Sequence, residues 1–451
     1  MLVDAIAHYH DLLTDRMAAD SQAQLEAQTR QRQFYFGARP ICTVLRPRFL
    51  TNSQFRVLQS AVKELGQAFD CIYQAAKVDG MFRRQFMLTD AEEELLQIHP
   101  SYKRCSFPTA RLDSFFASEK ELKFTEYNTE TPAGAAYHDA LTEIFYGLPV
   151  MQEFERRYDV RPLSARPGVM HALLDSYRQW AASGTSEPPR IAILDWKEVP
   201  TFSEFRLFDE YFHSHGLECR IVDPRDLEYR DGKLIAGDYH ITLIYKRVLI
   251  SELLQRGGLE QPLIRALRNH AACMVNSFGC KVLYKKASLA VLTDERNEAC
   301  FTPTMLEAIG RYIPWTRRVQ ERRTMFRGEP IDLIPYILAN RERLVLKPND
   351  EYGGKGIVLG WTVDDAAWEK AVLAALQEPY VVQEKVNLPR EVYPGYETGK
   401  LHLIERVLDT NPYVCFGSYM SGCLTRISTE ALVNVTAGGG STVPTYVLEE
   451  R

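Results

Sequence analysis

The segment Ala110–Gly134, ARLDSFFASEKELKFTEYNTETPAG, constrains the fold of this chain more than any other stretch. It predicts two strands joined by a polar turn over Ser118–Glu121. If Ala117 pairs with Leu122, antiparallel pairing fixes every other pair and puts all eight side chains on one face. The other three pairs are Phe115 with Phe124, Asp113 with Glu126, and Arg111 with Asn128.

The directly opposed Asp113 and Glu126 carry the chemical information of this hairpin. Two opposed carboxylates repel each other unless a cation lies between them. Oxygen ligands on a rigid hairpin suit Mg²⁺, which commonly takes one or two carboxylates together with phosphates and water. Two alternatives stay open: Arg111 alone neutralises a structural cluster, or a turn of different length separates the pair.

A lysine-bearing strand and a glycine loop occupy RLVLKPNDEYGGKGIVLG, residues 343–360. Lys347 ends an apolar strand, and Pro348 cannot donate to a sheet, so pairing weakens there. Three glycines let the backbone approach a ligand and expose amide donors; they are Gly353, Gly354 and Gly356. The pattern predicts a loop that binds polyphosphate between two strands. It differs from the strand-to-helix loop GxxxxGK[ST], a motif that this sequence lacks. The alternative is a glycine hairpin with a surface lysine.

A second strand, PYVVQEKVNLP, supports a nucleotide site beside the lysine strand. Gln383 and Glu384 interrupt its apolar run, and buried polar side chains need partners. An adenine ring and the amide groups around it would provide such partners. The alternative is an edge strand with solvent-facing polar residues.

A parallel α/β unit is predicted from about Arg190. The strand IAILDW follows the polar boundary SGTSEPPR, and Thr201 with Glu204 predicts a capping box for a helix that ends at Gly216. The strand ECRIVD comes next, which implies a parallel unit. After a further apolar run, Lys246 and Arg247 stand at a strand end, where open α/β sheets form ligand crevices. The alternative for both is a solvated strand end.

The first 104 residues have a mostly helical pattern. Within NSQFRVLQSAVKELGQAFDCIYQAAKV, apolar residues recur at helical spacing after a cap at Asn52 or Ser53. These apolar residues are Phe55, Leu58, Val62, Leu65 and Phe69. We interpret the region as scaffold.

Composition narrows the class of protein. A net charge of −5 gives no general basic field for nucleic acid or anionic lipid. No window approaches the ~20 apolar residues that span a bilayer, and the acidic N-terminal stretch is unlike a signal peptide. Nine cysteines without a CxxC pair predict reduced thiols. We expect a soluble, cytoplasmic protein.

Together these segments resemble ATP-grasp ligases, specifically the circularly permuted branch that contains the glutathionylspermidine synthetases. The resemblance covers about residues 105–450, and its strongest part is RLD followed by TEYNTETPAG. It implies ATP and Mg²⁺ as cofactors and Arg111 as a substrate or phosphate contact. The implied Mg²⁺ ligands are Asp113, Glu126 and Asn128.

The same resemblance assigns nucleotide and catalytic residues. It implies Lys286 and Lys347 as nucleotide lysines, with Lys285 as a one-residue-shifted alternative to Lys286. The terminal motif GCLTRISTEALVNVTAGGGSTVP implies Arg426 as a cation at the γ-phosphate, with Asn434 and Gly438–Gly440 nearby. The remaining nucleotide contacts are Gly353, Gly354, Lys355, Gly356, Gln383, Glu384 and Val386.

The implied fold is α/β (α+β), an ATP-grasp fold with a Rossmann-like pre-ATP-grasp domain and a helical N-terminal region. The expected parts are residues 1–104 as the helical region, 105–189 as the metal-binding hairpin and following helices, 190–281 as the Rossmann-like domain, and 282–451 as the nucleotide-binding region.

The resemblance implies an ATP-dependent carboxylate–amine ligase that works through an acyl phosphate, for which positioning and charge neutralisation matter most. Lys246 and Arg247 would then face the acid substrate. Expected partners are small-molecule or peptide acids and amines, without nucleic acid or membrane. The related synthetases carry a loop arginine where Tyr352 or its neighbours stand here, and Lys355 is its nearest substitute. A non-catalytic ATP-binding regulatory or scaffold protein and a small-molecule kinase are the alternatives.

Overall fold

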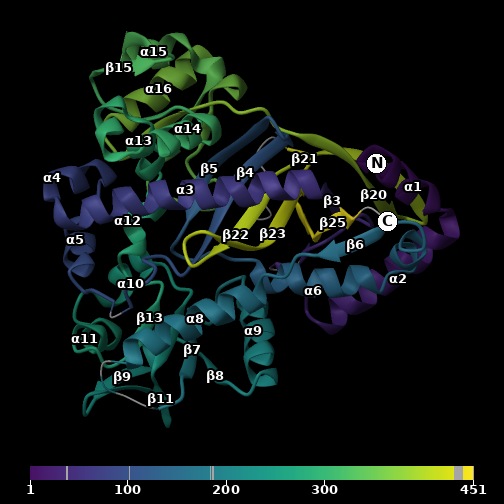
Figure 1. The fold of residues 1–451 in the computed structure, drawn as a ribbon, viewed down its shortest axis with the longest axis horizontal. Helices are drawn as coiled ribbons and strands as arrows, with labels where there is room; N and C mark the ends of the chain where they lie inside the picture. The colour runs from purple at the N-terminus through teal and green to yellow at the C-terminus, as the bar shows by residue number, and fades with distance from the viewer. Residues whose placement is uncertain (37–38, 101, 183, 185–186, 431–439, 450–451) are drawn as a thin grey trace.

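A seven-stranded antiparallel sheet forms the centre of the molecule (Figure 1). The computed structural model describes residues 1–451 except 37–38, 101, 183, 185–186, 431–439 and 450–451. The sheet order is β20-β21-β23-β22-β4-β5, with β24 beside β23, so a hairpin near residue 120 pairs with strands from the end of the chain. The strands are β4 (Thr109–Ser118), β5 (Glu121–Asn128), β20 (Arg390–Glu397), β21 (Lys400–Leu408), β22 (Asn411–Cys415), β23 (Tyr419–Ser428) and β24 (Ser441–Val443).

The β4–β5 hairpin has the predicted pairing at its polar end and a different pairing in its middle. Arg111 faces Asn128, and Asp113 faces Glu126, as expected. Two register irregularities lie between these pairs and the turn. The expected pairs Ala117–Leu122 and Phe115–Phe124 are therefore wrong, as is the single face for all eight side chains. The observed pairs are Ser114 with Phe124, Phe115 with Lys123, and Phe116 with Leu122.

Helix α3 (Asn52–Val78) crosses the central sheet (Figure 1). Its N-cap is Thr51, which precedes the two predicted caps, Asn52 and Ser53. Thr51 Oγ1 accepts from Gln54 N at 3.1 Å, and Gln54 Oε1 accepts from Thr51 N at 2.9 Å, which is a capping box. The Phe69 ring lies 4.2 Å from the Tyr127 ring, centroid to centroid. This contact joins the N-terminal helical region to the hairpin.

The two ends of the chain meet in a small sheet. Strand β25 (Thr445–Glu449) pairs in parallel with β3 (Arg48–Thr51) and antiparallel with β6 (Asp159–Pro162). The other helices surround the sheets. They are α1 (Leu2–Leu12), α2 (Asp15–Gln31), α4 (Gly80–Arg83), α5 (Asp90–Leu96), α6 (Ala135–Tyr146), α7 (Pro149–Phe154), α8 (Arg166–Ala181), α10 (Ile250–Gly257), α11 (Pro262–Arg268), α12 (Cys280–Tyr284), α13 (Ala287–Thr293) and α14 (Pro303–Tyr312).

A four-stranded parallel sheet has the order β13-β12-β7-β8. Helix α9 (Phe202–Ser214) connects β7 to β8, which confirms the predicted strand–helix–strand unit. The predicted capping box is wrong, because the Thr201 side chain makes no cap hydrogen bond and Glu204 Oε1 instead accepts from Gly134 N at 2.7 Å. The strands are β7 (Arg190–Leu194), β8 (Glu218–Val222), β12 (Leu243–Lys246) and β13 (Cys273–Val275).

The lysine strand belongs to a separate antiparallel sheet with its own core (Figure 1, top). The sheet order is β14-β19-β17-β18, and α15 (Leu333–Ala339) and α16 (Asp365–Ala375) pack with it around Trp368. Its strands are β14 (Thr316–Arg318), β17 (Leu344–Pro348), β18 (Val358–Leu359) and β19 (Tyr380–Glu384).

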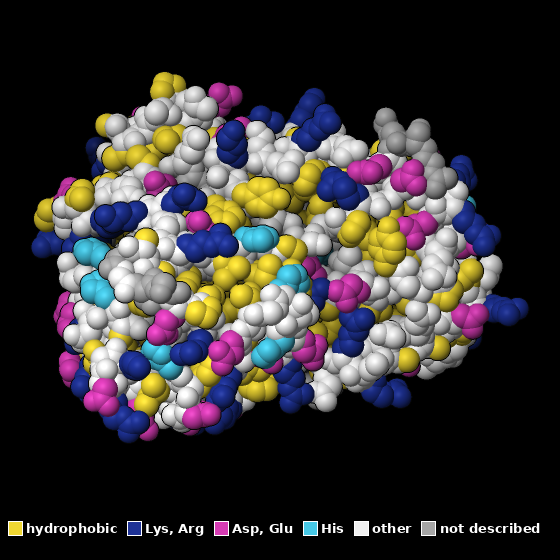
Figure 2. All heavy atoms as spheres, turned by 60° about the horizontal axis from the view of Figure 1, so that its bottom comes forward, with side chains coloured by type: hydrophobic (Ala, Val, Ile, Leu, Met, Phe, Trp, Pro, Cys, Tyr) yellow, Lys and Arg dark blue, Asp and Glu magenta, His cyan; other side chains and the backbone are white. Residues whose placement is uncertain are grey.

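The distribution of surface side chains and the free cysteines are those of an ordinary globular protein. Figure 2 shows one face on which hydrophobic side chains gather near the middle and charged side chains of both signs surround them. All nine cysteines lie in the described residues and are free, as predicted. Within the described ranges, no helix has both the length and the apolar character needed to cross a membrane.

Candidate functional site

Two cavities adjoin where the β4–β5 hairpin approaches the lysine strand. The first, here the lysine cavity, contains Lys347 in its lining. The second, here the arginine cavity, is lined by Arg111, Arg247 and Arg426. Four residues line both cavities: Asp113, Glu126, Gly353 and Arg426. The polar end of the hairpin is thus their junction.

Lys347 is the cation of the lysine cavity. Its Nζ donates to Gln383 Oε1 at 2.7 Å and to Thr125 O at 3.3 Å. Burial, with a smaller contribution from nearby Lys286, lowers the pKa of Lys347 to about 8 against the opposing charges of Glu126 and Asp113. The other predicted nucleotide contacts in this lining are Gly353, Gly354, Gln383, Glu384 and Val386.

The two remaining loop residues lie outside both linings. The Lys355 side chain is 77% exposed, with Nζ 3.4 Å from Glu351 Oε2. Gly356 has a φ of +72°, and a Cβ there would lie 2.7 Å from Pro348 Cγ. Gly356 therefore shapes the loop where another residue would collide with the lysine strand. Lys355, the nearest substitute for the loop arginine, is an exposed side chain outside both linings.

Lys286, rather than its neighbour Lys285, reaches the junction. Lys286 Nζ lies 3.1 Å from Glu126 Oε1 and donates to Glu351 O at 2.6 Å. Lys285 Nζ lies 2.9 Å from Glu92 Oε2 and 2.8 Å from Asp350 Oδ2, within a buried ion-pair network. The structure thus separates a site lysine from a structural one.

Two guanidinium groups hold Asp113. Arg111 donates from Nε to Oδ1 at 2.6 Å and from Nη2 to Oδ2 at 2.9 Å, while Arg426 Nη2 donates to Oδ2 at 2.8 Å. Burial acts to raise the pKa of Asp113, but the charges and hydrogen bonds of Arg111 and Arg426 hold it below its ordinary value. The expected residues Arg111 and Arg426 therefore lie together at the junction.

Asp409 is a site residue that the sequence did not reveal. It lines the lysine cavity and accepts from Arg426 Nε at 2.7 Å through Oδ2. Burial raises the pKa of Asp409 above its ordinary value, against the opposing effect of Arg426. The only indication in the sequence is its position directly after the apolar end of a strand.

Lys246 and Arg247, the two residues predicted to face a ligand crevice, lie in different surroundings. Arg247 lines the arginine cavity and donates from Nη2 to Glu204 Oε2 at 2.9 Å. Lys246 is absent from that lining, because its ammonium is buried and donates to Glu130 O at 3.0 Å and to Val248 O at 3.4 Å. Of the two residues predicted to face a substrate, the structure brings Arg247 to the cavity and leaves Lys246 as an internal cation. Asn434, Gly438 and Gly439 lie outside the described residues.

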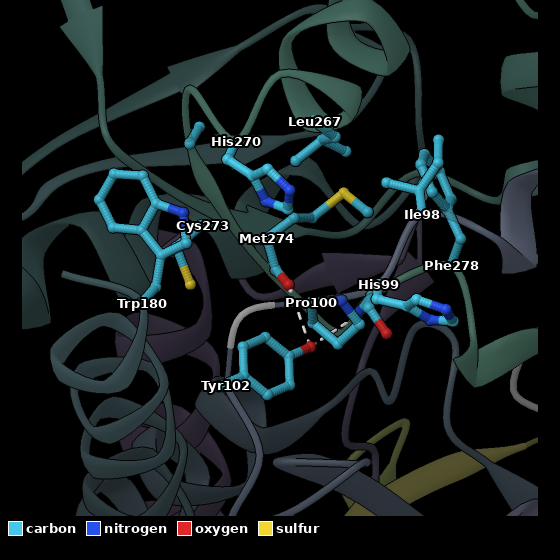
Figure 3. A pocket seen from close by; sticks show the side chains of 12 residues that line it. Ile98, His99, Pro100, Tyr102, Trp180, Leu267, His270, Cys273, Met274 and Phe278 are labelled. Atoms are coloured by element: carbon cyan, nitrogen blue, oxygen red, sulfur yellow. Dashed lines mark hydrogen bonds between the residues drawn. The ribbon is translucent and has the colours of Figure 1, made fainter. Parts of the chain in front are cut away.

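A further, small cavity lies away from these residues, beside β13 (Figure 3). Tyr102 Oη donates to Met274 O at 3.1 Å and accepts from Ser277 N at 2.9 Å across its edge. Its lining includes His99 and His270 but no Asp, Glu, Lys or Arg. None of the predicted site residues contributes to it.

Comparison with known proteins agrees with this geometry. The family model of circularly permuted ATP-grasp type 2 matches residues 112–428, which include most of β4, all of β5 and the lysine strand. The chain belongs to this family. The predicted ATP-grasp fold is confirmed, whereas the glutathionylspermidine synthetase branch stays a prediction.

Named relatives are distant. A Frankia casuarinae protein named "Putative glutamate–cysteine ligase 2-2" is 23% identical over 333 residues, which are 70% of this chain and 36% of that protein. The chain therefore spans about a third of the length of this relative. An uncharacterised protein of Mycobacterium leprae is 22% identical over 436 residues, covering 89% of this chain and 72% of the relative.

A solved structure shares the overall fold. The glutathione-synthetase-like effector of Globodera pallida, in its apo form, aligns with a TM-score of 0.60 at 13% identity. The alignment covers 95% of this chain and 96% of the effector. At this identity the similarity concerns the fold alone.

ATP-grasp proteins generally use ATP and Mg²⁺, and the hairpin offers a donor set for the metal. Asp113 and Glu126 face each other, and Asn128, whose amide oxygen is the atom that can bind a metal, pairs with Arg111 at the same end of the hairpin. Among the described residues, no group of three or more His, Cys, Asp or Glu could hold a metal. Two carboxylates and one amide fit Mg²⁺, which takes its other ligands from phosphates and water.

Proposed function

We propose that this ATP-grasp protein is a carboxylate–amine ligase that forms an amide through an acyl phosphate. The observation that carries the proposal is the junction of the two cavities at Asp113, Glu126 and Arg426. A nucleotide in the lysine cavity would direct its phosphates toward the junction. A second ligand in the arginine cavity would approach the same point from the other side.

Each cationic residue has a role that its position supports. Lys347 and Lys286 bind phosphate oxygens, and Gln383 with Val386 contacts the base. Arg426 and Arg111 stabilise the charge that spreads over the transferred group. Asp113, Glu126 and Asn128 would hold Mg²⁺, which neutralises phosphate charge when bound.

The chemistry proceeds in two displacements. A carboxylate oxygen of the acid attacks the γ-phosphorus, the bond to the β–γ bridging oxygen breaks, and ADP leaves. The amine nitrogen then attacks the acyl carbon, phosphate leaves with the bridging oxygen, and the nitrogen loses a proton. The Gly353–Gly356 loop would cover the nucleotide and exclude water during both steps.

The names of the relatives favour small acids and amines of the peptide type. Amino acids or short peptides are therefore the first substrates to examine. The glutathionylspermidine-like branch is a narrower hypothesis, which the acidic motifs of the hairpin support.

One observation favours a non-catalytic ATP-binding protein as the second candidate. The exposed Lys355 lies outside the linings of both cavities, and no other cation among the described residues of this loop lines them in place of the arginine of the related synthetases. Such a protein would bind ATP and act as a regulator or scaffold.

The test is a screen of acids crossed with amines in the presence of ATP and Mg²⁺. We expect at least one pair to release ADP and to yield a product whose mass is the sum of the pair minus water. ATP binding without any pair-dependent ADP would support the regulatory alternative. A stable phosphorylated acid without an amide would instead indicate a kinase.

A further inference from the structure

The arginine cavity has a second charged end, remote in sequence from the junction. Asp195 and Arg247 directly follow the neighbouring parallel strands β7 and β12, and Arg247 N donates to Leu194 O at 2.9 Å. Carboxyl ends of parallel strands meet at one edge of a sheet, so the two residues lie at the same edge. Glu252 on α10 lines the same cavity. These three residues are here called the strand-end group.

Arg247 has hydrogen-bonding capacity that the protein leaves unused. The residue is 4% exposed, and within the described ranges its Nε and Nη1 have no hydrogen-bond partner. Burying a charged donor without an acceptor is costly. Nε and Nη1 do not share an edge of the guanidinium, but each lies beside Nη2, which has a second hydrogen besides the one given to Glu204. One edge, Nη2 with either Nε or Nη1, therefore matches a carboxylate as a bidentate pair.

The existing partner of Arg247 does not remove its attraction for an anion. Glu204 shares its charge with the start of α6, because Glu204 Oε1 accepts from Gly134 N at 2.7 Å and from Ala136 N at 3.2 Å. A helix N-terminus carries partial positive charge. The Glu204 carboxylate thus interacts with both the start of α6 and Arg247. Arg247 can therefore attract a second anion.

The acidic members of the strand-end group both accept a hydrogen bond from Trp196. Asp195 Oδ1 accepts from Trp196 N at 2.8 Å, and Glu252 Oε2 accepts from Trp196 Nε1 at 2.7 Å. Neither carboxylate forms an ion pair with a described residue. Burial, with a smaller contribution from nearby Glu252, raises the pKa of Asp195 to about 6 against the opposing effects of the Trp196 backbone, Arg247 and Lys246. A bound ammonium group would offset the negative charge of Asp195 and Glu252.

We infer that the strand-end group binds the α-carboxylate and α-ammonium of an amino acid, with the carboxylate on Arg247 and the ammonium on Asp195 and Glu252. The inference rests on the proposed function, because it names the class of one ligase substrate. The side chain or acyl part of that amino acid then extends toward Asp113 and Arg426, which line the same cavity.

Part of the cavity lining is held by hydrogen bonds and close packing. Arg111, Ala133 and Gly134 all line the cavity. Arg111 Nη1 donates to Ala133 O at 2.6 Å, and Tyr413 Oη donates to the same oxygen at 3.0 Å. Gly134 has a φ of +98°, and a Cβ there would lie 2.7 Å from Tyr413 Oη. This part of the lining therefore has little room to move.

Calorimetry with the full chain, Mg²⁺ and a non-hydrolysable ATP analogue tests the inference. Each of the twenty protein amino acids is titrated, and we expect at least one to bind with a Kd below ~1 mM. Its analogues without the α-carboxylate or without the α-amine should bind at least about tenfold more weakly, a difference of 1.4 kcal/mol. Absence of saturable binding by all twenty overturns the inference.

Two conservative variants locate the binding. Arg247→Lys and Asp195→Asn should each weaken the amino acid at least about tenfold and leave the affinity for the ATP analogue unchanged. The matched control is Arg220→Ala, because Arg220 lies on β8 of the same sheet and pairs outward with Asp238 at 2.7 Å. If both test variants keep wild-type affinity for the amino acid, the strand-end group is not its site.

Because these titrations involve no turnover, they separate this inference from the proposed function. Amino-acid binding that depends on Arg247, without ADP release from any acid and amine, would refute ligase activity and keep the binding site. Equal turnover with acids that lack the α-amine or the α-carboxylate would refute the amino-acid site and keep the ligase.

Discussion

Arg426 on β23 donates from Nη2 to Asp113 Oδ2 on β4 at 2.8 Å, across 313 positions of the sequence. The same guanidinium binds Asp409, so one cation connects two buried carboxylates at the junction of the cavities. Removal of Arg426 should therefore affect both folding and chemistry, and the two effects are separable.

Arg426→Gln should lower the free energy of unfolding by about 3 kcal/mol, because Asp409 loses its ion-pair partner while buried. Turnover should fall by about 10²–10³, because a charge-stabilising donor is lost. Urea unfolding and ADP release measure the two effects. The double variant Arg426→Gln, Asp409→Asn should recover most of the stability and none of the turnover. Recovery of turnover in the double variant would show that Arg426 is only structural.

Glu126→Gln should raise the Mg²⁺ concentration for half-maximal ADP release by at least about tenfold. The change removes one of the two facing carboxylates and keeps the shape, while Lys286 retains its hydrogen bond to Glu351 O. The melting temperature should change little. The control is Glu121→Gln, an exposed carboxylate on the same strand. Full activity with an unchanged Mg²⁺ requirement would exclude Glu126 as a ligand.

Lys347→Met should weaken ATP binding by about tenfold, or 1.4 kcal/mol. The same change should stabilise the protein at pH 7 by about 2 kcal/mol, because burial lowers the pKa of Lys347 from 10.5 to about 8. Below pH 8 the folded protein bears the full cost of the buried charge. Between pH 8 and 10.5 the folded lysine deprotonates before the unfolded one, so this cost disappears.

The stabilising effect of Lys347→Met should accordingly shrink as the pH rises from 8 toward 10.5. Urea unfolding of both proteins at pH 7 and pH 10 measures it. A variant that is less stable than the wild type by the same amount at both values would show that Lys347 supports the fold rather than a ligand.

The hairpin shows what alternation along a strand can predict. The pairs nearest Asn128 were correct because the two irregularities cancel, with Ala117 as the extra residue on one strand and Thr125 on the other. Between them the residues of β5 change face, so Phe124 and Leu122 join the core with Phe116, while Phe115 stays on the cavity side with Asp113. Nothing in DSFFAS marks where a bulge occurs, since both phenylalanines suit either face.

The sequence allowed candidate site residues to be predicted where polar side chains stand within or directly after an apolar strand. Lys347 and Gln383 stood out as polar groups within apolar strands, and they bind each other at 2.7 Å. Lys246 and Arg247 could not both face one cavity, because successive residues at a strand end point to opposite sides. Asp409 was missed because its partner Arg426 approaches only after β21 and β23 pair.

Gly356→Ala should weaken ATP binding and lower the free energy of unfolding by about 1–2 kcal/mol, because alanine disfavours positive φ and its Cβ would meet Pro348. The control is Gly310→Ala on α14, where a Cβ meets no atom within 4 Å and helix propensity favours alanine. Titration with ATP and thermal melting measure both variants. Equal ATP affinity in the two would remove the loop from the nucleotide site.

The acyl-phosphate route is tested most directly with an acid whose carboxylate carries ¹⁸O, combined with the amine and ATP that the screen identifies. The carboxylate oxygen that attacks the γ-phosphorus stays with phosphorus when the amine displaces phosphate. We therefore predict that each turnover transfers one ¹⁸O atom from the acid to the released phosphate, as mass spectrometry of that phosphate would show. Amide formation with unlabelled phosphate would contradict the proposed function.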